Sequence, residues 1–190
     1  MVEARGREAT VHLAIEDASG DSAIVAYLDG EAVIHHGPRD RVMTNDPTYD
    51  EQLALLAARD FSKPSSEMPL PGNVNARDRF QCAAYYAALL PKPRSQREAI
   101  AAILAIARNV SVPFGAPYKS FGIYNTEYRT AIDLTNPTYF FELTTSPGVI
   151  WVDLKAIDLS ASQPVRAVDP DDLALAGDVT AKLAPIAAPF

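Results

Sequence analysis

The chain has 190 residues, with 17 Lys and Arg against 24 Asp and Glu, a formal net charge of −7, and 48% hydrophobic residues. This length predicts a single domain over residues 1–190, and the apolar fraction is that of a folded globular chain rather than a disordered one. The acidic balance without a basic cluster argues against a nucleic-acid binder, and the one cysteine excludes an internal disulfide framework and a Cys-rich zinc module.

The N-terminal part of the chain predicts a three-stranded antiparallel meander over about residues 10–36. Alternation of apolar and polar residues predicts the first strand, beginning at Val11. Two apolar runs, 23–28 and 31–35, predict the next two strands. Between these runs stands Asp29-Gly30, a strong signal for a two-residue hairpin because Gly tolerates the positive φ that a type I′ turn requires.

The middle of the chain predicts three helices. The first spans 49–58, has early acidic residues that suit the helix dipole, and has Pro47 in its first turn. The second spans about 79–90, with Asp78 as its N-cap, after a long loop over 59–76. The third spans 95–109 and opens with a capping box of Ser95 and Glu98.

The C-terminal part predicts a loop over 111–124 and a second three-stranded meander, rich in β-branched and aromatic residues, over 128–134, 138–143 and 149–154. The tail, 160–190, is polar and then rich in Pro and Ala, and is expected to wrap the surface. Two meanders with helices between them indicate two antiparallel sheets, each shielded by helices on one face. The expected fold is therefore a layered α+β arrangement, not a doubly wound one.

Two candidate groups have an ordinary explanation. Cys82 lies inside a helix beside Ala, where a cysteine is usually a small buried hydrophobe, and no neighbouring base or helix N-terminus lowers its pKa. A working thiol at Cys82 stays a weaker alternative. The adjacent His35 and His36 point to opposite faces of a strand and cannot chelate a metal as a pair, so no metal site is expected there.

Asn45 and Arg79 are the two candidate site residues. Asn45 lies in Thr-Asn-Asp-Pro at a strand-to-helix junction, where its amide and the backbone N–H groups could hold a developing oxyanion, although Asn in a turn commonly just closes an Asx turn or caps a helix. Arg79 starts an otherwise apolar helix. It is either a surface or capping residue or a fixed cation near a carboxylate or thiolate.

Several segments together resemble the choloylglycine hydrolase family, which includes bile salt hydrolases and penicillin V acylases and cleaves linear amide C–N bonds. The likeness runs in order over about residues 10–170 and is carried by HLAIEDASGDSAIVAYLDG (12–30), VMTNDPTYDEQL (42–53), LPGNVNARDRF (70–80), RNVSVPFGAPY (108–118) and TEYRTAIDLTNPTYFFELTTSPGVIWVDL (126–154). The nearest branch is the bacterial linear amide C–N hydrolases.

This resemblance implies an N-terminal-nucleophile hydrolase fold, a four-layer αββα sandwich, with a processed N-terminal cysteine as nucleophile and its own α-amino group as base. The Asn of the family's T-N-x-P motif, near the oxyanion hole, falls on Asn45. The Arg of the R-F motif, which supports the nucleophile, falls on Arg79. The resemblance also implies a small-molecule N-acyl amide substrate, no cofactor and a homo-oligomer, a tetramer in the family.

The chain departs from the family at its start, because Met1-Val2 carries no thiol and Cys82 matches no catalytic position. It resembles a C-terminal portion of the enzyme, so the sandwich is expected to be incomplete and the 190-residue chain to be inactive alone and prone to aggregate. A non-enzymatic remnant or binding module that keeps the second half of the fold is the alternative. Whether the chain is itself an enzyme stays open at this point.

The sequence says less about which loops line the substrate pocket and about the cellular compartment of the protein. The loops 59–76 and 111–124 are the candidates for the remaining pocket walls. No apolar stretch approaches the length of a membrane span, and the charged N-terminal segment is not a signal peptide. The compartment stays unknown, since family members occur both inside the cell and exported from it.

Overall fold

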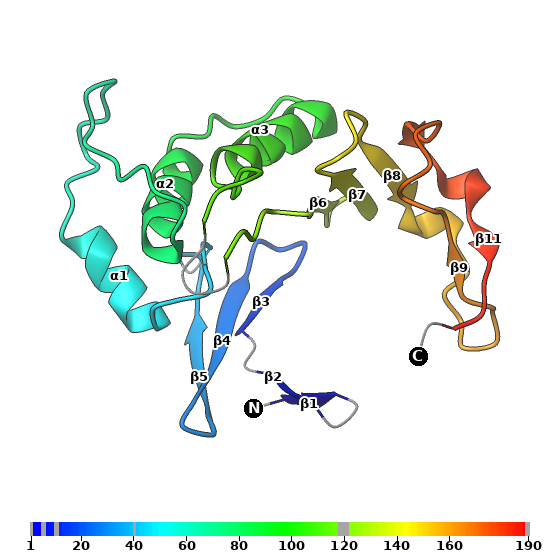
Figure 1. Ribbon diagram of the computed structural model, residues 1–190, viewed down its shortest axis with the longest axis horizontal. Helices are drawn as coiled ribbons and strands as arrows, with labels where there is room; N and C mark the ends of the chain where they lie inside the picture. Colours follow the sequence, from blue (N-terminus) through cyan, green and yellow to red (C-terminus); the bar gives the residue numbers. More distant parts are fainter. Residues whose placement is uncertain (1, 5–6, 10–11, 40, 118–121, 189–190) are drawn as a thin grey trace.

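The structure, a computed structural model, describes residues 2–4, 7–9, 12–39, 41–117 and 122–188 (Figure 1). The first main sheet has the order β3-β4-β5, with β3 (His12–Glu16), β4 (Ser22–Leu28) and β5 (Glu31–His36) antiparallel, which confirms the predicted meander. Its hairpin turn has φ of 51° at Asp29 and 85° at Gly30, as a type I′ turn requires. Val11, placed in the first predicted strand, lies outside the described residues.

A short ribbon of β1 (Val2–Ala4) and β2 (Arg7–Ala9) precedes this sheet and was not predicted. Each of its strands has only three residues, which is too short for an alternating pattern to stand out in the sequence.

Two helices cover one face of the first sheet: α1 (Tyr49–Ala57) and α2 (Ala76–Ala88). Ile24 of β4, Tyr49 of α1 and Phe80 of α2 form one buried cluster, and each is at most 4% exposed. The period-2 alternation of β4 puts Ser22, Ile24 and Ala26 on this buried face. The predicted packing of helices on a sheet is therefore confirmed here.

The predicted start of the first helix at Tyr49 is confirmed, whereas the place given to Pro47 and the predicted start of the second helix are wrong. Pro47 lies outside the first turn of α1, because Thr48 is the N-cap and its N–H and hydroxyl both donate to the Glu51 carboxylate, at 3.1 and 2.8 Å. The second helix begins at Ala76 rather than near residue 79. Its N-cap is Asn75, whose side-chain oxygen accepts the N–H of Asp78 at 2.9 Å, so Asp78 belongs to the first turn.

The second main sheet has the order β10-β8-β7-β6 and is covered by α3 (Gln96–Asn109). Its strands are β6 (Tyr128–Asp133), β7 (Thr138–Leu143), β8 (Ile150–Asp153) and β10 (Gly177–Asp178). Leu104 of α3 packs with Ala131 and Phe140 to form the core of this layer pair. The Ser95 hydroxyl accepts the Glu98 N–H as predicted, whereas Glu98 accepts from the N–H of Arg94.

The tail does more than wrap the surface. β10 pairs in parallel with β8 and adds a fourth strand to the predicted meander, and the intervening β9 (Arg166–Ala167) pairs with β11 (Ala184–Pro185) at the orange and red end of the chain (Figure 1). A single-turn helix, η2 (Leu154–Ala156), precedes the tail, and another, η3 (Thr180–Lys182), lies within it. Val179, which follows β10, is fully buried.

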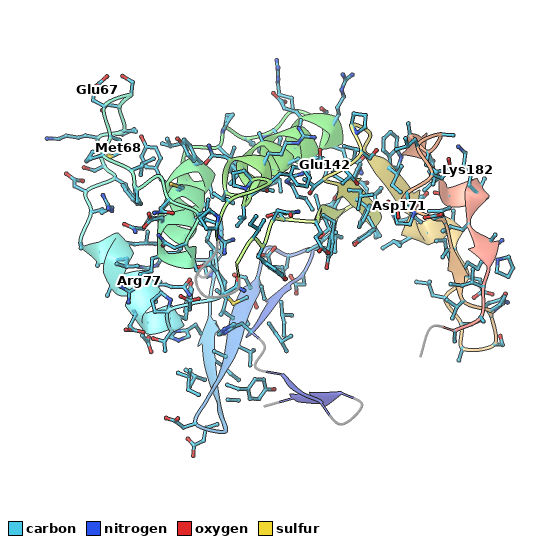
Figure 2. All side chains as sticks on the ribbon, in the orientation of Figure 1. Glu67, Met68, Arg77, Glu142, Asp171 and Lys182 are labelled. Carbon is cyan, nitrogen blue, oxygen red and sulfur yellow. The ribbon has the colours of Figure 1, made fainter. Side chains whose placement is uncertain are left out.

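A buried ion-pair network fastens α3 to the second sheet. The carboxylate of Glu142 on β7, labelled in Figure 2, accepts from the Arg108 Nε of α3 at 2.9 Å and from the Arg129 Nη1 of β6 at 3.0 Å. Burial alone raises the pKa of Glu142, but the guanidinium of Arg108 and then that of Arg129 outweigh it and leave this pKa below its usual value. The network therefore holds Glu142 ionised at neutral pH.

The outer face of the first sheet is apolar and exposed. Leu13, Val25 and Ile34 are paired across β3, β4 and β5, and Leu13 and Ile34 are 44% and 63% exposed. Helices thus cover one face of each main sheet, and the layered α+β arrangement is confirmed. No helix in the described part of the chain has both the length and the apolarity needed to cross a bilayer.

Candidate functional site

The candidate site is built on the segment that links β5 to α1. Asn45 is exposed at the tip of its turn, and within the described residues its side-chain amide makes no hydrogen bond. The residues that precede it, Val42 and Met43, pack against the buried cluster of Ile24, Tyr49 and Phe80. A free primary amide is therefore presented to solvent from a segment whose base is anchored in the core.

A buried glutamine of α1 holds this turn. Gln52 is 1% exposed, and its Nε2 donates to the carbonyl oxygens of Thr44 at 3.0 Å and of Pro47 at 2.7 Å. Its Oε1 accepts the Thr44 N–H at 3.2 Å. Sequence reasoning missed this residue, although the spacing of Tyr49, Gln52 and Leu56 puts Gln52 on the buried face of an amphipathic helix.

The turn is also joined to the start of α2, where the second candidate residue lies. The Thr44 hydroxyl donates to the carbonyl oxygen of Ala76 at 3.0 Å, and Ala76 is fully buried. Arg79, three residues further along α2, is half-buried, and its Nε donates to the Val74 carbonyl at 3.0 Å. The segments that carry Asn45 and Arg79 are therefore held together through Thr44.

Arg79 lies at the start of α2, after the N-cap residue, and a hydrogen bond to the neighbouring backbone holds its guanidinium in place. Asn75 caps the helix, and the carboxylate of Asp78 accepts the Asn73 N–H at 3.1 Å, which ties the preceding loop to the same turn. With its Nε directed to the Val74 carbonyl, Arg79 has little freedom to move. Its lasting positive charge suits a site where a thiolate or an oxyanion forms.

Cys82 is not prepared for nucleophilic attack. Its Sγ lies 2.9 Å from the Pro71 carbonyl oxygen, which can accept the thiol proton only as a hydrogen bond and is not a base. Burial, followed by the nearby Asp78 carboxylate, raises the pKa of the Cys82 thiol, while Arg59 partly opposes this. The thiol therefore stays protonated at neutral pH, contrary to what a cysteine nucleophile needs.

The two adjacent histidines point to different partners. His35 Nε2 lies 3.6 Å from Asp50 Oδ1 and its ring meets Tyr49 edge-on, whereas His36 Nε2 lies 2.9 Å from Asp21 Oδ2. They lie on opposite faces of β5, as the strand period predicts. Among the residues that the structure places, no group of three or more His, Cys, Asp or Glu side chains could hold a metal ion.

A cleft lies beside the start of the segment that links β5 to α1. It measures about 270 Å³, lies against α1 and α2, and is lined by Leu53, Phe80 and Ala84 with Arg39 and Arg41 among its walls. In the predicted wall 59–76, Arg59 donates to Gln81 of α2 and to the Pro69 carbonyl. The other predicted wall, 111–124, includes residues 118–121, which lie outside the described residues. Both loops stay predictions as substrate walls.

Comparison with known proteins gives a consistent picture. Residues 2–167 match the family of linear amide C–N hydrolases, choloylglycine hydrolase family. A penicillin V acylase of Pectobacterium atrosepticum is 41% identical over 173 residues, which are 84% of this chain and 46% of that protein.

Solved structures agree with the sequence matches. The penicillin V acylase from Agrobacterium tumefaciens is 42% identical, with a TM-score of 0.81 over 94% of this chain and 57% of that one. A variant of the conjugated bile acid hydrolase from Clostridium perfringens is 15% identical and shares the fold, with a TM-score of 0.64 over 80% of this chain and 52% of that one. The fold is that of the N-terminal-nucleophile hydrolases, and the chain spans about half the length of these relatives.

Proposed function

Because this chain belongs to the linear amide C–N hydrolases of the choloylglycine hydrolase family, we propose that it forms the oxyanion-binding part of an enzyme that cleaves N-acyl amides of the penicillin V type. The observation that carries this proposal is the exposed Asn45 amide, held on a turn that Gln52 and Thr44 fasten to α1 and α2. The substrate class follows from two relatives above 40% identity, both penicillin V acylases.

Asn45 acts at the moment when charge develops on the substrate. A thiolate attacks the amide carbonyl carbon and forms a C–S bond, and the carbonyl oxygen takes up the electron pair as an oxyanion. The Asn45 Nδ2 donates a hydrogen bond to that oxygen. As the oxyanion collapses, the C–N bond breaks and the nitrogen leaves as an amine after receiving a proton. Water then hydrolyses the thioester, which breaks the C–S bond, releases the carboxylic acid and regenerates the thiol.

Arg79 supports the attacking group with a fixed positive charge. A guanidinium near the nucleophile favours the thiolate over the thiol, because opposite charges lower the pKa of an acid. The hydrogen bond from Arg79 Nε to the Val74 carbonyl orients the group. Arg79 is therefore a positioning and electrostatic residue in this proposal, while the nucleophile is a different residue from any in these 190.

Cys82 is the one cysteine of these 190 residues, and no base in the described part of the chain makes hydrogen-bond contact with its thiol. We expect the 190-residue polypeptide on its own to show no turnover. We also expect it to self-associate, because exposed apolar side chains such as Leu13 and Ile34 are stabilised by contact with another copy.

The test uses an enzyme in which residues 2–188 of this chain replace the matched segment of the Agrobacterium tumefaciens acylase (the chimera). The relative then supplies whatever this chain does not match. We expect the chimera to hydrolyse penicillin V and Asn45→Ala to lower its kcat by about 10²–10³-fold. The matched control is Asn136→Ala, which removes an Asn amide from the β6–β7 turn on the other sheet and leaves kcat unchanged.

Two results would count against the proposal. An active chimera whose kcat is the same with and without the Asn45 amide removes Asn45 from the oxyanion role. A chimera that keeps the circular dichroism and melting behaviour of the acylase but has no turnover favours the non-enzymatic remnant instead.

A further inference from the structure

Gln52 is an unusual residue for its place in the fold. It occupies the buried face of α1 between Tyr49 and Leu56 and is 1% exposed, where an apolar side chain would pack without any need for hydrogen bonds. A buried primary amide costs free energy unless all its polar atoms find partners. The partners of the Gln52 side chain therefore indicate why the amide is present.

Among the residues that the structure describes, the hydrogen bonds of the Gln52 side chain all go to the turn that carries Asn45. Nε2 donates to the carbonyls of Thr44 and Pro47, which lie one residue before and two residues after Asn45. Oε1 accepts the Thr44 N–H at 3.2 Å and lies 3.4 Å from the Thr44 hydroxyl. One amide thus holds the turn at both ends, while Asn45 itself stays exposed.

The amide orientation follows from its surroundings. The Thr44 N–H needs an acceptor and the two carbonyl oxygens need donors, so only one assignment of Oε1 and Nε2 satisfies all three groups. An apolar side chain would remove the buried protein partner of these three backbone groups. The turn would then lose the contacts that fix it to α1, and the Asn45 amide would lose its fixed position with it.

We propose that Gln52 is a positioning residue for the amide hydrolysis, which acts through Asn45 by holding the backbone of residues 44–47 in the geometry that presents the Asn45 amide to the oxyanion. This inference rests on the proposed function. It gives Gln52, a buried residue of α1 that touches neither substrate nor nucleophile, a role in the reaction.

The activity test is a double-mutant cycle in the chimera. Gln52→Met keeps the side-chain length and removes all the hydrogen bonds, and we expect it to lower kcat by about 10–100-fold with KM changed less than about threefold. In the Asn45→Ala background, the same substitution should lower kcat by less than about threefold, because the amide that it misplaces is already absent.

A control separates positioning from stability. Leu56→Ala removes packing from the same buried cluster without touching the turn. We expect it to lower the melting temperature at least as much as Gln52→Met while leaving kcat within about twofold of the parent. Equal losses of kcat in both variants would overturn the positioning role.

Hydrogen exchange tests the same inference without any substitution. Because the Thr44 N–H is held by a buried oxygen, its exchange in the parent chimera should be slowed at least 100-fold relative to an unstructured amide. Exchange at the unstructured rate would overturn the inference, even if Gln52→Met yields no folded protein.

The possible failures are distinguishable. Losses of kcat that multiply in the cycle, or no loss for Gln52→Met, overturn the role of Gln52 and leave the oxyanion role of Asn45 intact. An unchanged kcat for Asn45→Ala overturns both.

Discussion

Replacing Glu142 by Gln tests how the second sheet holds its helix. The Glu142 side chain is 8% exposed, and its negative charge faces both Arg108 and Arg129 in the network. Gln keeps the shape of the side chain and can accept one hydrogen bond, but it removes the charge. The loss in the free energy of unfolding therefore depends on how exposed to water each guanidinium is.

The exposed fractions of the two arginines set the size of this loss in the free energy of unfolding. Arg129 is 13% exposed and stays buried without a counter-charge, a situation that costs about 3–5 kcal/mol. Arg108 is 49% exposed and rehydrates, so it adds about 1 kcal/mol or less. Because Gln retains one acceptor, we expect a loss near the lower bound, about 3 kcal/mol. The matched control Arg108→Gln should cost about 1 kcal/mol or less.

The single tryptophan makes the assay local. Trp151 packs on Phe140 in the same layer pair, with ring centroids 5.7 Å apart, so its fluorescence reports on unfolding of this sheet. In urea at low micromolar protein, a loss of about 3 kcal/mol moves the midpoint down by about 1.5 M for a slope of about 2 kcal/mol/M. If the Glu142→Gln chain shows no folded baseline in urea, the substitution has cost at least the whole free energy of unfolding of the parent. Equal midpoints for Glu142→Gln and Arg108→Gln would refute the reasoning.

The ion pairs of Glu142 also make the stability of the chain depend on pH. The pKa of Glu142 is lowered in the folded state, so its stabilisation is fully present above the unfolded value of about 4.3 and is lost as the pH falls through the folded value. The difference in midpoint between the parent and Glu142→Gln should stay constant from pH 7 to about 5 and shrink below about pH 4. A difference that grows in acid would contradict this sign.

Two further predictions concern the first layer pair and its thiol. Phe80→Ala empties a 1% exposed site between Ile24 and Tyr49 and should lower the free energy of unfolding by about 3–5 kcal/mol in urea unfolding followed by far-UV circular dichroism; a loss under about 1 kcal/mol would show that this cluster is not a packed core. Cys82→Ala should leave penicillin V hydrolysis by the chimera unchanged, and because the Cys82 pKa is raised, the native thiol should react with iodoacetamide more slowly at pH 8 than free cysteine does. Alkylation as fast as that of free cysteine, or loss of turnover in Cys82→Ala, would restore Cys82 as a candidate.

Local signals were enough for most elements of the fold. The alternation in β3 and β4, the Asp29-Gly30 turn and the Ser95 cap each follow from a few neighbouring residues, and the structure contains all of them. The start of α2 could not be chosen from the sequence, because Asn75 and Asp78 are both good N-cap residues three positions apart. Only the hydrogen bond from the Asp78 N–H to the Asn75 side chain decides between them.

Long-range contacts account for what the sequence analysis missed. β10 has two residues and forms only because β8 offers an edge, so no local pattern marks it. The turn of Asn45 was predicted from Thr-Asn-Asp-Pro, but its attachment to α2 through Thr44 and Ala76 depends on residues 32 positions apart. The role of Asn45 and Arg79 in catalysis stays a prediction. The structure shows how the segments that carry them are held.

The most direct measurement is the rate of penicillin V hydrolysis by the purified 190-residue chain beside that of the chimera at equal concentration. The account predicts turnover by the chimera and none by the chain alone, since the one thiol present is protonated and hydrogen-bonded to the Pro71 carbonyl. Hydrolysis by the chain alone that disappears in Cys82→Ala would contradict it.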